Sequence, residues 1–581
     1  MALSSNVKER ATELLGALYG CEGAKETLAG LERLLTEVLG SPSMKRPRPA
    51  LSERDALLIT YGNTFSAPGE APLATLLRFL KQHVGDAISL VHLLPIFPYS
   101  SDDGFSVVNY REVNAELGGW QDVEQIAEHY GLALDLVLNH CSRSHLWFQD
   151  YIRGETPGRD YFVEADPADP RLALVTRPRN SPLMTPVEVR DQGSRWVWTT
   201  FSADQVDLNF ANPAVLLEFA AILMDYIRRG ARVVRLDAVA YLWKTLGTPC
   251  INLPETHAVV KCLRLLVDEA APGTLLLTET NVPQTENLSY FGDGDEAHLI
   301  YQFSLAPLLL YALTLGRTAA LQAWAVSLPP PPPGGGYVNF TASHDGVGLR
   351  PLEGLVSEAD RDALLRRMRE RGGYVSMRRL PDGRDAPYEL NISYYSALAG
   401  DDGEAAQLSR FLLAQTVALS MQGVPALYVQ SLIATESDLL GVERSGQTRA
   451  INRRRWDYGE LSALLAREGS VQMRCLSEIV RRLKLRRAHP AFHPEAAQEI
   501  LETEDGVFAV LRTPPPSPGS QAVPMLCLFN FTPETREADV TPLCDEDGRQ
   551  SLVDVIGNRR IACPRGLMRL PAYAALWLKA V

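Results

Sequence analysis

The chain has 581 residues and a formal net charge of −13 at pH 7, with 46% hydrophobic and 22% charged residues. This ordinary globular composition excludes general disorder, and the negative balance argues against a nucleic-acid partner. The eight cysteines form no CxxC pair, which argues against a zinc ribbon or a redox motif. Because neither a secretory signal nor an apolar run of membrane-spanning length is found, we expect a cytoplasmic protein without a membrane partner.

Residues 1–50 are predicted to form an N-terminal helical extension, because leucines recur at helical spacing between Leu14 and Leu35. In residues 51–488 the hydrophobic pattern changes, and short apolar runs alternate with longer amphipathic stretches, as expected of a catalytic barrel domain. Nearly continuous apolar strands are typical of a parallel sheet that is buried on both faces. Eight such runs predict an α/β fold built on a (β/α)8 TIM barrel, with strands near 56–61, 88–94, 132–138, 232–236, 274–277, 299–303, 337–340 and 426–429.

Two insertions interrupt the barrel, one at 141–211 after the third strand and one at 346–403 after the seventh. Long loops within a compact domain usually carry function. Residues 489–581 show short alternating runs separated by turn residues, which predict a C-terminal antiparallel β-domain.

Three carboxylates stand where barrel strands end, the position at which such barrels place their chemistry. Asp237 closes the fourth run, Glu279 follows the fifth and Asp345 follows the seventh. Strand alternation puts Arg235 on the same side as Asp237, where it would keep that carboxylate ionised. Glycoside cleavage needs such a set, with one acid for the leaving oxygen and a second carboxylate opposite the anomeric carbon.

Four segments resemble, in order and spacing, the motifs of the α-amylase family, glycoside hydrolase family 13. They are DLVLNH at 135–140, RLD at 235–237, TE at 278–279 and HD at 344–345. The resemblance implies a retaining mechanism through a covalent glucosyl-enzyme. It assigns the nucleophile to Asp237, the acid/base to Glu279 and transition-state stabilisation to Asp345. It also implies that the two motif histidines and the motif arginine belong to the sugar site, namely His140, His344 and Arg235.

Within that family, residues 55–581 resemble the sucrose phosphorylase subgroup. SDDGF at 101–105 is similar to the subgroup's donor-glucose motif, in which Asp102 would hold the far hydroxyls and Phe105 would shield the sugar face. QVD at 205–207 and INR at 451–453 are also similar and add Gln205 and Arg453 to the expected sugar-binding set.

The finer resemblance is to the glucosylglycerate phosphorylases, carried by TRPR at 176–179, TETNVP at 278–283 and ASHDGVGL at 342–349. It implies reversible phosphorolysis of 2-O-α-D-glucosylglycerate to α-D-glucose 1-phosphate and D-glycerate. Asn281 and Glu389 depart from sucrose phosphorylase, which carries a histidine and a glutamine there. Both would lie near the acceptor.

An anionic acceptor and phosphate need cationic and hydroxyl donors, which the two insertions offer. The candidates for this acceptor and phosphate set are Arg177, Arg179, Asn281, Arg384, Tyr388 and Glu389. Phosphate is expected as a co-substrate, and no other cofactor is expected. No metal is expected either, although Asn139 stands where calcium-binding relatives have a ligand, because the resembled subgroup is calcium-free. The oligomeric state is left open between monomer and homodimer.

Several alternatives stay open at this stage. The acceptor side alone separates this hypothesis from phosphorolysis of sucrose, sucrose 6′-phosphate or glucosylglycerol. An α-glucosidase or transglucosylase would share the donor-side residues. A catalytically silent sugar-binding barrel is the alternative of another class, and it typically lacks one of the three carboxylates.

Overall fold

A closed barrel of eight parallel strands forms the centre of the protein. The computed structural model describes residues 3–39, 44, 49–380, 383–516, 523–543, 551–562 and 566–580. The predicted TIM barrel is confirmed, and each strand overlaps one of the eight apolar runs. In order around the barrel these are β1 (Leu57–Thr60), β3 (Leu90–Leu93), β4 (Gly131–Val137), β9 (Ala231–Asp237), β10 (Leu275–Thr278), β11 (Leu299–Tyr301), β12 (Gly336–Phe340) and β16 (Val424–Tyr428).

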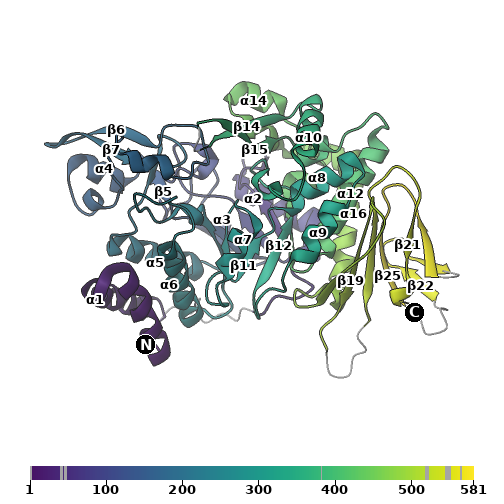
Figure 1. Ribbon diagram of the computed structural model, residues 1–581, viewed down its shortest axis with the longest axis horizontal. Helices are drawn as coiled ribbons and strands as arrows, with labels where there is room; N and C mark the ends of the chain where they lie inside the picture. Colours follow the sequence, from purple (N-terminus) through teal and green to yellow (C-terminus); the bar gives the residue numbers. More distant parts are fainter. Residues whose placement is uncertain are drawn as a thin grey trace.

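Amphipathic helices cover the outside of the barrel (Figure 1). Local sequence sets their ends: in α5 (Pro213–Arg228), the Asn212 side chain accepts a hydrogen bond from the Ala214 amide and Pro213 occupies the first turn. Gly230, with φ of 110°, then turns the chain into β9. The other helices around the barrel are α2 (Pro72–Phe79), α3 (Trp120–Ala127), α6 (Pro254–Ala270), α7 (Gln284–Leu288), α8 (Leu305–Leu315), α9 (Ala319–Ser327), α11 (Tyr394–Ala397), α12 (Glu404–Ser420), α13 (Val429–Leu432), α15 (Tyr458–Ala466) and α16 (Val471–Arg486).

The N-terminal residues form α1 (Ser5–Val38), which bends at Gly20 where φ is 70°. Figure 1 shows α1 against α5 and α6, the helices that precede β9 and β10. Gly30 permits the close approach, because a Cβ there would lie 2.8 Å from the Leu217 side chain of α5. The extension therefore braces the part of the barrel that presents Asp237 and Glu279.

Long excursions gather at the carboxyl ends of the strands, along the upper part of Figure 1. Between β4 and α5 lie β5 (His140–Ser142), α4 (Leu146–Arg153), β6 (Met184–Val189), β7 (Gly193–Trp198) and β8 (Gln205–Asp207). After β12 come β13 (Val347–Gly348), α10 (Glu358–Glu370), β14 (Tyr374–Arg379) and β15 (Asp385–Asn391). A third excursion, which the sequence did not set apart, follows β16 with α14 (Leu439–Ser445), the short helix η10 (Thr448–Asn452) and β17 (Trp456–Asp457), which pairs with β2 (Phe65–Ser66).

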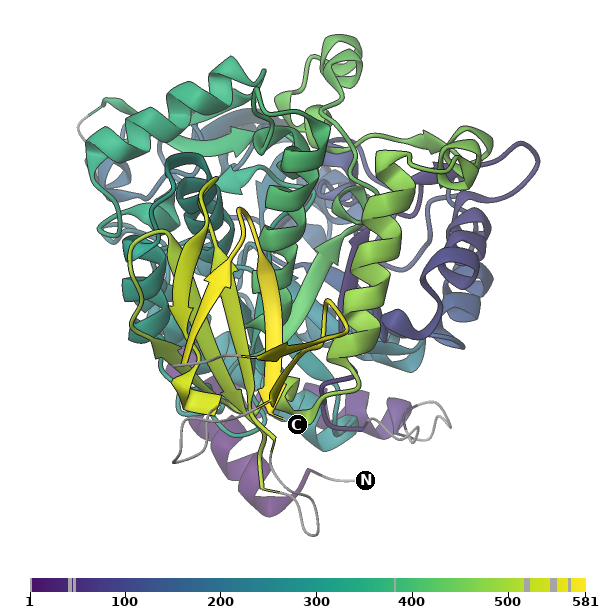
Figure 2. The same ribbon diagram turned by 90° about the vertical axis from the view of Figure 1, so that its right-hand side faces the viewer.

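The end of the chain forms a separate antiparallel β-structure, in the order β18-β19-β20-β25-β22-β23 (Figure 2). This confirms the predicted C-terminal β-fold. The sheet packs on α12 and α16, where Arg512 donates hydrogen bonds to carbonyls that include Ser420 at 2.8 Å. Its strands, with the small pair β21-β24 beside them, are β18 (Ala497–Leu501), β19 (Val507–Thr513), β20 (Met525–Asn530), β21 (Arg536–Asp539), β22 (Ser551–Asp554), β23 (Arg559–Ala562), β24 (Leu567–Leu570) and β25 (Ala575–Ala580).

No helix in the described part of the chain is long and apolar enough to cross a membrane. Two of the eight cysteines, Cys544 and Cys563, lie outside the described residues, as do Pro381 and Asp382 in the second insertion.

Candidate active site

The three predicted carboxylates meet at the carboxyl end of the barrel and line one cleft. Asp237 is the last residue of β9, and pairing of β9 with β10 sets Leu236 beside Thr278, the residue before Glu279. The Ala238 amide then donates a hydrogen bond to Glu279 Oε2 at 3.0 Å. Asp345 enters from the loop after β12. The barrel thus brings together residues that lie more than a hundred positions apart.

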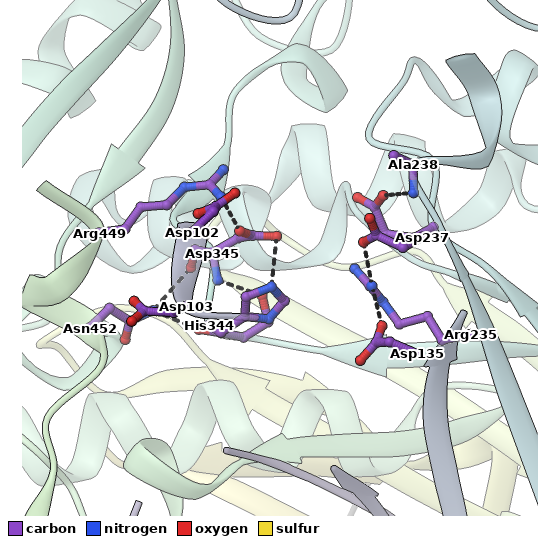
Figure 3. Close-up of polar contacts among 12 residues, drawn as sticks. Asp102, Asp103, Asp135, Arg235, Asp237, Ala238, His344, Asp345, Arg449 and Asn452 are labelled. Atoms are coloured by element: carbon purple, nitrogen blue, oxygen red, sulfur yellow. Dashed lines mark hydrogen bonds and ion pairs between the residues drawn. The ribbon is translucent and has the colours of Figure 1, made fainter. Parts of the chain in front are cut away.

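Arg235 orients Asp237 from within the barrel (Figure 3). Its Nη1 lies 2.6 Å from Asp237 Oδ1 and 2.5 Å from Asp135 Oδ1. Asp135 is held in turn by His92 Nε2 at 2.8 Å. The guanidinium and both aspartates are buried, so these charge-assisted bonds fix the Asp237 carboxylate in one place.

Asp237 and Glu279 differ in how directly Arg235 holds them, because a hydrogen bond joins Arg235 to Asp237. Burial raises the pKa of Asp237 and of Glu279, and Arg235 partly offsets the shift at both. Because Arg235 bonds directly to Asp237, it favours the ionised form of that carboxylate and leaves Glu279 as the better place for a proton. Nucleophilic attack with acid assistance requires this division of roles, with one ionised carboxylate and one carboxylic acid.

Asp345 is held by a cation that the sequence analysis did not identify. Arg449 Nη1 lies 2.6 Å from Asp345 Oδ1, and its Nη2 lies 2.7 Å from Glu389 Oε2. Burial alone would raise the pKa of Asp345, but Arg449, followed by His344 and Arg453, brings it below its ordinary value. Asp345 is consequently ionised and anchored.

The predicted sugar-binding residues surround the same carboxylates. The Phe105 ring stacks on the His344 ring with centroids 4.7 Å apart and planes 6° apart. Gln205 Nε2 lies 3.1 Å from His140 Nε2. Burial lowers the pKa of both histidines, so each is neutral and can donate one hydrogen bond and accept another.

Arg453 links two segments that carry predicted sugar-binding residues. Its Nη1 lies 2.7 Å from Asp103 Oδ2 and 3.9 Å from Asp102 Oδ1. Its Nε donates to the His344 carbonyl at 2.9 Å, so one side chain ties the 101–105 motif to the loop that carries Asp345. The pairing with Asp103 was not predicted.

The positive charge next to Asn139 is the ammonium group of Lys244. Lys244 Nζ lies 2.7 Å from Asn139 Oδ1 and 2.7 Å from Asp207 Oδ2, with its side chain 5% exposed. Asn139 also donates to Asp207 at 3.1 Å. The buried charge of Asp207 is thereby matched, and the pair fastens the end of β4 to β8.

The predicted acceptor residues divide into two groups. Asn281, Arg179, Tyr388 and Glu389 line the cleft with the carboxylates, and the Arg179 guanidinium lies 5.8 Å from the centroid of the Tyr388 ring. Arg177 and Arg384 are absent from the described residues that line this cleft. Arg177 turns instead to the Ser181 carbonyl within its own loop, and Arg384 is exposed.

The sequence contained a signal that could have identified Arg449 as a residue of the site. Arg449 lies four residues before the predicted Arg453, and the two share the short helix η10 and its end. The assignment of Arg453 to the site therefore pointed to Arg449 as a second arginine of the same short segment.

A barrel with this set of strand-end carboxylates, arginine and histidines defines a class of enzymes that act on glycosidic bonds. The family model described as "Alpha amylase, catalytic domain" matches residues 76–325. The chain belongs to the α-amylase family, as its sequence motifs predicted.

Comparison with individual proteins shows which members of this family the chain is similar to. A glucosylglycerate phosphorylase of Spirochaeta thermophila is 44% identical over 90% of this chain and 89% of its own. A glucosylglycerate phosphorylase of Escherichia coli is 39% identical over 99% of this chain and 100% of its own. Among solved structures, sucrose 6F-phosphate phosphorylase from Thermoanaerobacter thermosaccharolyticum has a TM-score of 0.73 at 22% identity, covering 90% of this chain and 100% of its own. The last likeness concerns the fold alone.

Proposed function

We propose that the protein is a retaining glycoside phosphorylase that converts 2-O-α-D-glucosylglycerate and phosphate into α-D-glucose 1-phosphate and D-glycerate. The observation that carries this proposal is the 39% identity to a glucosylglycerate phosphorylase over 99% of the chain, acceptor-side excursions included. The convergence of Asp237, Glu279 and Asp345 on one cleft supplies the chemistry.

In the first half-reaction, an oxygen of Asp237 attacks the anomeric carbon. The bond from that carbon to the glycerate oxygen breaks, and Glu279 gives its proton to the departing oxygen. The product is a covalent glucosyl-enzyme and free glycerate. Arg235 keeps Asp237 ionised and aimed for this attack.

In the second half-reaction, phosphate replaces glycerate. Glu279, now a carboxylate, takes a proton from a phosphate hydroxyl as that oxygen attacks the anomeric carbon, and Asp237 departs. Two inversions give net retention, and Glu279 ends protonated as it began. The neutral His140 and His344 would bind sugar hydroxyls, while the anchored Asp345 would bind them more strongly in the transition state.

Phosphate and glycerate are both anions, so one cationic region can serve them in turn. Arg179 suits this role because it lines the cleft and has no carboxylate within ion-pair distance among the described residues. Its contact with the face of Tyr388 holds the guanidinium without neutralising it. A cation that was already paired would bind an incoming anion more weakly.

We also propose that the reaction needs no cofactor or metal, takes only small sugars, acids and phosphate as partners, and runs in the cytoplasm. The ammonium of Lys244 supports the metal-free proposal, since it supplies the positive charge beside Asn139 and Asp207. Dialysis against EDTA should leave activity unchanged, and a loss that Ca²⁺ restores would overturn this part.

The test is phosphate release from α-D-glucose 1-phosphate by the purified protein with D-glycerate, glycerol, fructose, fructose 6-phosphate or buffer alone. Fast release only with D-glycerate is the expected result. A preference for another acceptor would keep a phosphorylase and change its substrate. Release without any acceptor would favour an α-glucosidase, and no release from folded protein would refute the phosphorylase.

A further inference from the structure

Arg350 lies next to the acceptor side of the cleft, in a segment whose backbone is tied to it. Arg350 begins the short helix η9 (Arg350–Leu352), two residues after β13. The amide of the preceding Leu349 donates to the Tyr388 carbonyl at 2.9 Å. One residue earlier, Gly348 packs so closely on Asn281 that an added Cβ would lie 2.7 Å from Asn281 Oδ1. Two predicted acceptor residues therefore fix the position from which this arginine extends.

The burial of Arg350 differs from that of every comparable arginine in the described chain. Arg350 is 9% exposed, yet its side chain has no hydrogen-bond or ion-pair partner among the described residues, and its Nε is fully buried without one. Five other buried arginines all have partners. Acidic side chains bind Arg235 and Arg410, and backbone carbonyls bind Arg482, Arg486 and Arg512.

A buried guanidinium without a partner destabilises the folded protein, because the charge has lost its water and gained nothing in return. Such a group is expected where the missing partner is a ligand. Arg350 Nε is sealed from solvent, whereas its two terminal nitrogens are not among the sealed atoms. Those terminal nitrogens are the pair that grips two oxygens of a carboxylate or phosphate at once.

Arg350 is not among the described residues that line the cleft, but it directly follows Leu349, whose amide bonds the carbonyl of the cleft residue Tyr388. Burial raises the pKa of Tyr241, and the charge of Arg350 opposes that rise; Tyr388, Glu279 and Arg179 act on the same hydroxyl. The charges of Arg350 and Glu279 thus both act on the Tyr241 hydroxyl. Together with the backbone bond to Tyr388, this indicates that Arg350 extends near the acceptor residues of the cleft.

We propose that Arg350 binds the oxyanion of the acceptor, the glycerate carboxylate in one half-reaction and phosphate in the other. This inference rests on the proposed function and adds a residue to it that motif likeness did not assign. Arg179 and Arg350 together supply two guanidinium groups without carboxylate partners among the described residues, enough for a doubly charged phosphate. Their preorganisation also favours an anion over water as the attacking group.

The test is the fate of the glucosyl-enzyme formed from α-D-glucosyl fluoride, with Arg350→Met, Arg350→Lys and the natural chain. In one arm phosphate competes with water, and α-D-glucose 1-phosphate is measured against glucose. In a second arm D-glycerate competes with water. A product ratio does not depend on the amount of folded enzyme, so a partly misfolded variant still reports correctly.

For Arg350→Met we expect both ratios to fall at least about tenfold toward glucose, with a smaller fall for Arg350→Lys. The matched control is Arg482→Met, a buried arginine with carbonyl partners, whose ratios should stay unchanged while its melting temperature falls. Arg350→Met should melt no lower than the natural chain, because it removes an unpaired buried charge.

Unchanged ratios in both arms would overturn the inference, and a fall in only one arm would overturn the shared use of Arg350 by the two anions. If the natural chain itself makes only glucose in both arms, the proposed function fails first and this inference fails with it.

Discussion

The arginines on the donor and acceptor sides of the cleft are held in different ways. On the donor side, Arg453 is bonded to Asp103 and to the His344 carbonyl, and Phe105 stacks on His344. On the acceptor side, the guanidinium groups of Arg179 and Arg350 have no carboxylate partner among the described residues. The donor side always binds the same glucosyl group, so its arginine can be fixed by the protein alone. The acceptor side must receive two different anions in turn, and its two arginines are left for those anions to pair with.

Asp237→Asn should have the largest effect, because it removes the nucleophile on which both half-reactions depend. We expect turnover to fall by ~10⁴-fold or more, measured as phosphate release from α-D-glucose 1-phosphate with D-glycerate. The amide keeps the shape of the side chain, so thermal melting should stay close to that of the natural chain. More than one per cent residual turnover, in protein free of the natural chain, would contradict the assignment.

Glu279→Gln separates acid assistance from the rest of donor-side binding. With glucosylglycerate we expect a loss of ~10³-fold, since the leaving oxygen goes unprotonated. With α-D-glucosyl fluoride the first half-reaction should lose far less, because fluoride departs without a proton. An equal loss for both donors would mean that Glu279 is not the acid.

The pH dependence follows from the same carboxylate. Burial raises the pKa of Glu279, so its proton is present below that raised value and is lost as pH rises through it. The specificity constant for glucosylglycerate should therefore fall on the alkaline side. Glu279→Gln has no proton to lose there, so its residual activity should lack this limb. If the alkaline fall of the specificity constant persists in the variant, it arises from the titration of a group other than Glu279.

Glu389→Gln tests the link between the donor and acceptor sides of the cleft, where Arg449 forms ion pairs with both Glu389 and Asp345. The neutral amide removes one of the two carboxylates that share the single positive charge of Arg449, and so shifts that charge toward Asp345. We expect kcat to fall by about 10- to 100-fold, in line with the loss of a buried charge-assisted bond. Glu443→Gln, on exposed α14, is the matched control. Unchanged kcat with altered affinity for one anion alone would place Glu389 in acceptor binding.

Arg179→Gln should give the smallest effect, confined to the acceptor side. We expect the KM values for phosphate and D-glycerate to rise about tenfold while kcat changes little, since one charge-assisted contact is lost in binding. Arg177→Gln is the natural control, because that guanidinium turns to the Ser181 carbonyl of its own loop. A larger effect at Arg177 than at Arg179 would reverse the comparison of the two loop arginines.

The reaction-centre residues were predictable because barrel geometry makes strand ends converge. Asp237, Glu279 and Asp345 each follow an apolar run, and eight such runs admit one arrangement of their carboxyl ends. The acceptor arginines were not predictable in the same way. Arg177, Arg179 and Arg384 all stand in long excursions, and only tertiary packing decides which of them turns inward. Nothing in the sequence singled out Arg350, because its burial depends on how η9 packs against α8 in the folded chain.

The double contact of Arg449 has a consequence for both sides of the cleft. One guanidinium is shared between the carboxylate that grips the sugar and the strand that carries Tyr388 and Glu389. Any displacement of Glu389 would therefore change the contact of Arg449 with Asp345, and free-energy linkage would make the influence mutual. The two sides of the cleft are in this way joined through a single side chain.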